Sequence, residues 1–236
     1  SGRELVYFCT QMSRQTSLAG PSADTDRDTI TAGEIKVLLT RGDTAQARER
    51  FEELVRNQQQ RASRIAYRYL RNAADVDDAV QDAFVKAFVH LPSFRQELPF
   101  VVWFTRIVIN GCLDRLKAKN RSRRWVVPMF DSSASDRDFA EQQPAKGGTP
   151  ETALLAKERQ EHLSAAVQRL PERQRTALIL GVFEGYTAEE ISTVMGLNES
   201  TVRVHQFRAV RSLRKLVGND RWLVEQQIDR EGVRQP

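Results

Sequence analysis

The stretch TAEEISTVMGLNESTVRVHQFRAVRSLRKLV, residues 187 to 217, decides the fold of the C-terminal half of this chain. Thr187 is a typical N-cap residue, and Glu190, three positions later, completes a capping box that starts a helix. Apolar residues then recur at helical spacing as far as Gly196, which can adopt the left-handed conformation that ends a helix. The pattern predicts two helices joined by a tight turn.

The second helix of this pair has an apolar inner face, and either Asn198 or Ser200 can cap it. Its other faces carry the cations Arg203, Arg208, Arg211, Arg214 and Lys215. A helix, a glycine turn and a basic second helix are typical of the helix-turn-helix, which places its second helix in the DNA major groove. A helical hairpin with an ordinary solvated face is the alternative. The turn, the caps and the single sign of the charge together favour DNA.

Length and composition bound the rest of the chain. Its 236 residues are enough for two small domains and a linker, and 40% of them are hydrophobic. The formal net charge of +5 favours an anionic partner. No apolar run approaches the length that spans a bilayer, so we expect no membrane insertion. Cys9 and Cys112 lie far apart without metal-ligand spacing, which favours a reducing, cytoplasmic setting.

Helical periodicity occurs in two blocks, which predicts an all-α protein of two small helical domains joined by a flexible linker. The expected segments are a mobile N-terminal extension at 1–28, a first domain at 29–124, a linker at 125–150, a second domain at 151–218 and a tail at 219–236.

The first domain contains a helix with a broad apolar face, which we expect to begin at Asp75 or Asp77. Its opposite side is polar and carries Asp75, Asp78, Gln81 and Asp82. Acidic residues near a helix N-terminus also suit the helix dipole, so a purely structural role is the alternative.

A loop with an aromatic residue, PSFRQELP at 92–99, follows that helix and leads into a helix predicted from residue 100 to 124. The end of this second helix is strongly basic, with Lys117, Lys119, Arg121, Arg123 and Arg124. Cations beside aromatic residues suit single-stranded nucleic acid, although a solvated basic helix end is also common.

Sequence motifs of catalysis are missing. There is no GxxxxGK phosphate loop and no GxGxxG motif after a strand, and His90, His162 and His205 are scattered. We therefore expect a binding protein rather than an enzyme, with no cofactor and no metal.

Four stretches together resemble a known family: DVDDAVQDAFVKAF, LPSFRQELPF, VVWFTRIVINGCLDRLK, and LPERQRTALILGVFEGYTAEEISTVMGLNESTVRVHQFRAVRSLRKL. They are similar to the extracytoplasmic-function sigma factors of bacterial RNA polymerase, which are RpoE-like members of the sigma-70 family. The resemblance extends from Ile30 to Leu216. It implies that the first domain is region 2 and the second is region 4.

The family resemblance also implies a function. Such a protein binds core RNA polymerase, brings it to promoter DNA and opens the −10 element so that transcription starts. It has no catalytic residues of its own, and an anti-sigma factor commonly holds it inactive.

The resemblance assigns roles to individual residues. Core-polymerase binding falls to Asp75, Asp78, Gln81 and Asp82. Contact with the −10 element falls to Phe94, Arg95, Trp103, Arg106, Asn110, Lys117 and Arg121. Contact with the −35 element falls to Ser200, Thr201, Arg203, Phe207 and Arg208, of which Ser200 and Thr201 are also expected to cap the helix. Phe94 and Arg95 belong to the loop that holds a flipped-out base. Arg203 suits a guanine edge and Phe207 a thymine methyl group.

Two other classes of protein are possible from the residues alone. An ordinary helix-turn-helix regulator would account for the C-terminal half, but it would leave the acidic helix, the aromatic loop and the basic helix end of the N-terminal half without a function. A structural helical adaptor would need none of the basic faces. Binding to core polymerase distinguishes the sigma factor from both.

Overall fold

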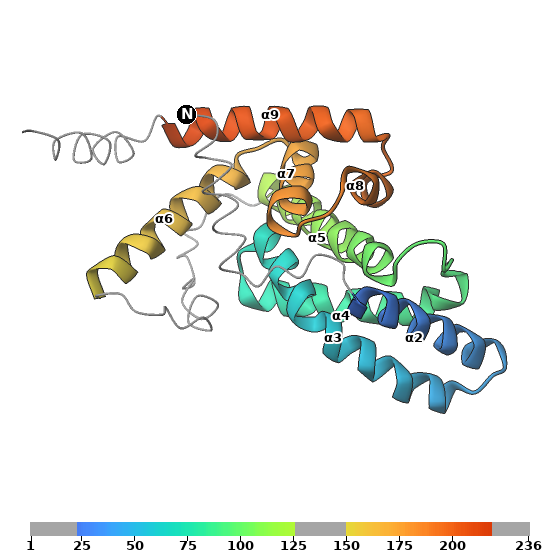
Figure 1. The fold of residues 1–236 in the computed structure, drawn as a ribbon. Coiled ribbons are helices and arrows are strands. Elements are labelled where there is room, and N and C mark those ends of the chain that lie inside the picture. Colours follow the sequence, from blue (N-terminus) through green and yellow to red (C-terminus); the bar gives the residue numbers. More distant parts are fainter. Residues whose placement is uncertain (1–22, 126–149, 219–236) are drawn as a thin grey trace, which may run out of the picture. The chain divides into compact units, whose positions relative to one another are not determined.

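The computed structural model describes residues 23–125 and 150–218, which Figure 1 shows in colour. These residues belong to two compact units, each of which is described by itself. Helices are the regular elements of the described ranges, which contain no strand, and the predicted all-α class is therefore confirmed.

The first unit is built from four long helices and one short 3-10 turn. They are α2 (Ala23–Thr40), α3 (Thr44–Leu70), α4 (Ala73–His90), η1 (Leu91–Ser93) and α5 (Phe100–Trp125). The helix α3 packs against α2, α4 and α5, while α5 also packs against α2 and α4.

Aromatic rings fill much of the space between these helices. Phe51 on α3 packs edge-on against Phe84 and Phe88 of α4, with ring centroids 6.3 and 5.1 Å apart. Phe84 stacks on Phe104 of α5 at 4.6 Å, and Phe104 in turn stacks on Phe100 at 5.7 Å. This chain of rings joins α3 to α5 through α4, so the position of α5 depends on contacts between three helices.

Two helix starts differ from the prediction. The extension expected at residues 1–28 already enters α2 at Ala23. Asp28 is 1% exposed, and its carboxylate accepts hydrogen bonds from Asn57 Nδ2 at 2.8 Å and Gln58 Nε2 at 2.6 Å. The polar residues at the start of α2 gave no helical pattern, and the buried carboxylate of Asp28 receives its hydrogen bonds from side chains of α3. The other difference is Asn72, which caps α4 by accepting a hydrogen bond from the Asp75 N–H at 3.0 Å.

The helix α3 has a capped start and no break. The carboxylate of Asp43 accepts a hydrogen bond from the Gln46 N–H at 3.2 Å, and α3 is continuous from Thr44 to Leu70.

The second unit is built around α9. Its elements are α6 (Pro150–Gln168), α7 (Glu172–Leu178), the π-helical segment η2 (Ile179–Phe183), α8 (Ala188–Met195) and α9 (Glu199–Gly218). Both α6 and α7 pack against α9. The π-helical segment was not predicted from the sequence. Leu154 on α6 is 59% exposed.

The predictions for the N-terminal residues up to 22, most of the linker and the C-terminal tail lie outside the described residues.

Candidate nucleic-acid interface

The turn between α8 and α9 forms through local hydrogen bonds. Thr187 Oγ1 accepts from the Glu190 N–H at 3.2 Å, and Glu190 Oε2 accepts from the Thr187 N–H at 2.8 Å, so the predicted capping box is confirmed. Gly196 has a φ of 64° in the left-handed region, as predicted, and the next N–H, that of Leu197, donates to Ser192 O at 3.0 Å. These bonds end α8 and fix the direction in which the chain enters α9.

The start of α9 is capped by Asn198. Its Oδ1 accepts the Thr201 N–H at 2.9 Å and the Ser200 hydroxyl at 3.1 Å. Of the two caps that the residues predicted, Asn198 and Ser200, the structure has Asn198, because its amide oxygen reaches the Thr201 N–H. The caps that the resemblance implied, Ser200 and Thr201, supply donors to Asn198 instead.

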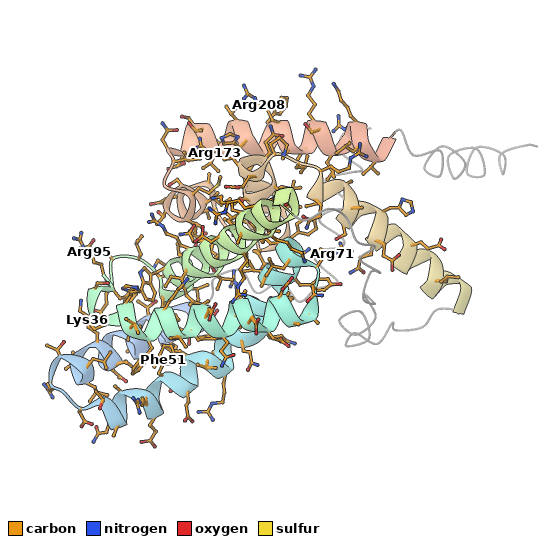
Figure 2. All side chains as sticks on the ribbon, turned by 180° about the vertical axis from the view of Figure 1, so that it is seen from behind. Lys36, Phe51, Arg71, Arg95, Arg173 and Arg208 are labelled. Atoms are coloured by element: carbon orange, nitrogen blue, oxygen red, sulfur yellow. The ribbon has the colours of Figure 1, made fainter. Side chains whose placement is uncertain are left out.

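The helix α9 buries one face and exposes the other. Val202, Ala209 and Leu213 are at most 1% exposed. The side chains of Arg203 and Phe207 are both 69% exposed. Arg208 is exposed as well, and Figure 2 shows it extending from the outer side of the helix.

The exposed face of α9 therefore presents guanidinium groups beside an aromatic ring. Arg203 Nη2 contacts Glu199 Oε2 at 2.9 Å, one helical turn away. An exposed pair of this kind contributes little to stability, so Arg203 can exchange Glu199 for another acceptor at small cost. Guanidinium groups suit guanine edges and phosphates, and an apolar ring suits a thymine methyl group.

In the first unit, the loop before α5 places Phe94 in the core. Its side chain is 0% exposed, and its ring lies 5.2 Å from the ring of Trp103 and 5.9 Å from that of Phe100. No part of the Phe94 ring is accessible in this structure, so its predicted contact with a flipped-out base would require the loop to rearrange. Its neighbour Arg95 is exposed and extends away from the unit (Figure 2).

The helix α5 brings the other predicted −10 residues onto one face. Trp103 is half-buried, and the exposed residues are Arg106, Asn110, Lys117 and Arg121. Their spacing places all of them within one stripe at 100° per residue, and the stripe is about 27 Å long at 1.5 Å per residue. One helix face thus offers an aromatic ring, an amide and three cations, a set that suits stacked bases and a phosphate backbone.

The acidic side of α4 is paired with cations of α5. Lys119 Nζ lies 3.4 Å from Asp75 Oδ2, and Arg115 contacts both Asp78 and Asp82. Gln81 is exposed on the same helix. The sequence indicated a basic end of α5, but not that Arg115 and Lys119 turn toward α4.

These ion pairs leave the acidic surface accessible. The side chains of Asp75, Asp78 and Asp82 are 40%, 67% and 59% exposed. Exposed ion pairs contribute roughly 0–1 kcal/mol, so the carboxylates can take another cationic partner.

The one thiol that the structure describes is inert. Cys112 is fully buried in α5, and burial raises the pKa of its thiol from 9.0 to about 12. Within residues 23–125 and 150–218, no group of His, Cys, Asp and Glu side chains is arranged to hold a metal ion. None of the described helices is both long and apolar enough to cross a membrane.

Comparison with known proteins places both units in one family. The family model for sigma-70 region 2 matches residues 54–122, and the model for sigma-70 region 4 matches residues 160–213. The first match contains α4, the loop and nearly all of α5. The second contains the helix-turn-helix.

Curated relatives match over most of their length. The RNA polymerase sigma-H factor of Pseudomonas aeruginosa is 36% identical over 70% of this chain and 84% of that protein. The sigma-E factor of Escherichia coli K12 is 33% identical over 67% of this chain and 82% of its own length. The sigma factor SigM of Mycobacterium tuberculosis is 30% identical over 71% and 77%.

Two solved structures share the fold. CnrH, solved in complex with the cytosolic domain of CnrY, has a TM-score of 0.55 and 23% identity over 82% of this chain and 98% of that chain. The sigma factor RpoE of Bartonella quintana, solved with the anti-sigma factor NepR, has a TM-score of 0.56 and 21% identity over 72% and 98%. The likeness in fold agrees with the sequence matches, and this chain belongs to the extracytoplasmic-function sigma factors of the sigma-70 family.

Proposed function

We propose that this sigma factor brings core RNA polymerase to promoters by dividing recognition between its two units. Region 2 binds the polymerase and the opened −10 element, and region 4 binds the duplex at the −35 element. The single observation that carries the proposal is the stripe on α5, where Trp103, Arg106, Asn110, Lys117 and Arg121 share one face beside the loop.

The α5 stripe suits an opened strand better than a closed duplex. An aromatic ring can stack on a base only where that base has left its helical stack, and the amide of Asn110 can then bond the exposed base edge. Lys117 and Arg121 continue the stripe toward the C-terminal end of α5, where they would neutralise backbone phosphates. In the loop, Arg95 takes the role of a contact with DNA, while Phe94 supports the loop from within.

In region 4, α9 is the helix that enters the major groove. Arg203 is the candidate for a guanine edge, Phe207 for a thymine methyl group and Arg208 for a phosphate. Ser200 and Thr201 stand at the N-terminus of α9, where a phosphate is favoured by the helix dipole and the free N–H groups.

The acidic side of α4 is the proposed polymerase-binding surface. Asp75, Asp78, Gln81 and Asp82 would meet a basic surface of the polymerase, and a polymerase cation would then displace Arg115 or Lys119 from its present partner. Because exposed pairs are weak, this exchange costs little.

Regulation by an anti-sigma factor is part of the proposal. A neighbour of this fold, RpoE of Bartonella quintana, was solved with the anti-sigma factor NepR. An inhibitor of this chain would act by covering its polymerase-binding or DNA-binding surface. We expect the protein to act in the cytoplasm, where polymerase and promoters meet, and to be a binding factor without an enzymatic activity of its own.

A reconstituted transcription reaction tests the proposal. The purified chain is added to core polymerase and a library of promoter DNA, and we expect initiation from a defined set that shares −10 and −35 sequences. Tight binding to promoter duplex without any binding to core polymerase would support a helix-turn-helix regulator instead. Failure of both would support the structural adaptor.

Charge reversal on α4 tests the docking surface. The double variant Asp78→Lys, Asp82→Lys should lose binding to core polymerase while its circular dichroism remains that of the native protein. The double variant Asp77→Lys, Glu49→Lys is the matched control, because it makes the same change in net charge at two exposed residues that were not assigned to the surface. Equal loss in the control would mean that net charge, rather than this surface, decides binding.

A further inference from the structure

We propose that three residues along α2, Thr29, Gly33 and Lys36, form a cradle that positions the base-reading loop at 91–99. The proposal rests on the function proposed above, because it explains how that loop is held ready for DNA. The cradle precedes residues 54–122, which match the region 2 family model, so it lies outside the part of the chain that the model covers.

The first two cradle contacts are hydrogen bonds to backbone groups of the loop and of the residue that ends it. Lys36 Nζ donates to the Phe94 carbonyl at 2.8 Å. Thr29 Oγ1 accepts from the Phe100 N–H at 3.0 Å, which satisfies one of the free donors at the start of α5. Thr29 and Lys36 are seven residues apart and therefore lie on the same face of α2.

The third contact depends on a missing side chain. Gly33 is buried on the same face of α2, four residues after Thr29. A Cβ atom built on Gly33 would lie 1.5 Å from Gln96 Nε2 and 2.8 Å from Gln96 Cδ. The Gln96 side chain thus occupies the space that any residue other than glycine would fill. A glycine inside a helix is otherwise unfavourable, and this contact accounts for it.

Together, these contacts hold the loop on both sides of Arg95. Phe94 is fixed by its carbonyl and by its buried ring, and the end of the exposed Gln96 side chain lies over Gly33. Figure 2 shows Lys36 near this end of the unit and Arg95 extending into solvent. A side chain whose backbone is fixed in advance loses less freedom when it binds a base, so it discriminates between bases more sharply.

The decisive variant is Gly33→Ala, studied with and without Gln96→Ala. Its new methyl group must displace the Gln96 side chain. We expect faster amide hydrogen exchange at residues 91–99 and a lower preference for the native −10 base at the loop, by about 2-fold, because the displaced end of the exposed Gln96 side chain can move at small cost. In the Gln96→Ala background, Gly33→Ala should have no further effect, because the side chain that it displaces is gone.

The glycine variant has a matched control on α5. A Cβ atom at Gly111 would meet nothing within 4 Å, so Gly111→Ala changes the same chemical group without a collision. We expect native loop exchange and native base preference in this variant.

The lysine contact has its own series. Lys36→Met keeps the length of the side chain but removes the donor, and it should lower the −10 base preference by roughly 2- to 10-fold. Lys36→Arg keeps a donor and should restore most of the preference. Arg48→Met removes one exposed charge from α3 and controls for the change in net charge.

These experiments distinguish a failure of the cradle proposal from a failure of the proposed sigma-factor function. If the wild-type chain starts no transcription, the proposed function fails, but hydrogen exchange in the loop still decides whether α2 positions it. Native exchange and native base preference in Gly33→Ala would overturn the cradle. So would an equal effect of Gly33→Ala with and without Gln96, or a uniform loss of initiation on every −10 sequence.

Discussion

The two DNA-facing surfaces of this protein are built in different ways. In region 4, the bonds that shape α8 and α9 join near neighbours in the sequence, such as Thr187 with Glu190 and Asn198 with Thr201. In region 2, the loop is held by two bonds between distant parts of the sequence. Lys36 bonds Phe94, which lies 58 positions later, and Thr29 bonds Phe100, which lies 71 positions later. The surface of region 4 follows from local chemistry, whereas the loop of region 2 takes its shape only after α2 has packed against it.

Two phenylalanines test this difference most strongly. Phe94→Ala removes a fully buried ring and should destabilise region 2 by about 3–5 kcal/mol, the usual cost of truncating a core phenylalanine. Phe207→Ala removes a ring that is 69% exposed and should change stability by less than about 0.5 kcal/mol while weakening binding to the −35 duplex.

Native-state hydrogen exchange measures the stability of each unit separately, and band-shift assays measure duplex binding. Phe94→Leu keeps apolar volume and should recover part of the lost stability. A stable Phe94→Ala variant with weakened −10 contact would return this residue to the role of a base contact.

The recognition helix offers a sharper test of how its surface works. Arg203→Ala should cost about 1–3 kcal/mol of discrimination at one base pair of the −35 element, because a guanidinium that bonds a base edge is lost. Binding constants for a set of singly substituted duplexes would locate that base pair. Arg203→Lys is the control that keeps the charge. Equal weakening on every duplex in the alanine variant would make Arg203 a phosphate contact.

Removing the cap of α9 should change stability by a smaller amount, and only in region 4. Asn198→Ala should destabilise region 4 by about 1 kcal/mol, because the Thr201 N–H loses its acceptor at the start of the helix. Ser200→Ala should cost less, since its hydroxyl supports Asn198 rather than a backbone donor. Hydrogen exchange in α9 distinguishes the two. A larger effect of Ser200→Ala would identify Ser200 as the true cap.

The sequence predicted region 4 well for the same physical reason. Thr187, Glu190 and Gly196 determine the structure through interactions with residues a few positions away. The capping box and the left-handed turn are both present, as predicted. The π-helical segment at Ile179–Phe183 was missed, because no local pattern distinguishes it from an ordinary helix.

Region 2 was predicted in its class but not in its details. Phe94 was assigned to a base contact by the family resemblance, and its burial depends on Trp103 and Phe100 of the following helix. The start of α2 was missed because the carboxylate of Asp28 is buried against amides of α3, about 30 residues away. Contacts of this kind leave no periodic signal in the sequence.

The buried thiol of region 2 provides the smallest effect and the most selective one. Burial raises the pKa of Cys112 from 9.0 to about 12, so folding favours the protonated thiol. Below pH 9 both the folded and the unfolded chain keep the thiol proton, so the stability of region 2 does not depend on pH through this group. As pH rises from 9 toward 12, the unfolded chain releases a proton that the folded chain retains, and region 2 loses stability. Cys112→Ala should remove this part of the alkaline loss of stability in region 2. In a Cys9→Ser background, where Cys112 is the only cysteine, the rate of alkylation should follow the opening of region 2 alone. Rapid alkylation of the native protein at pH 8 would contradict the burial of this residue, and with it the packing on which the whole surface of region 2 depends.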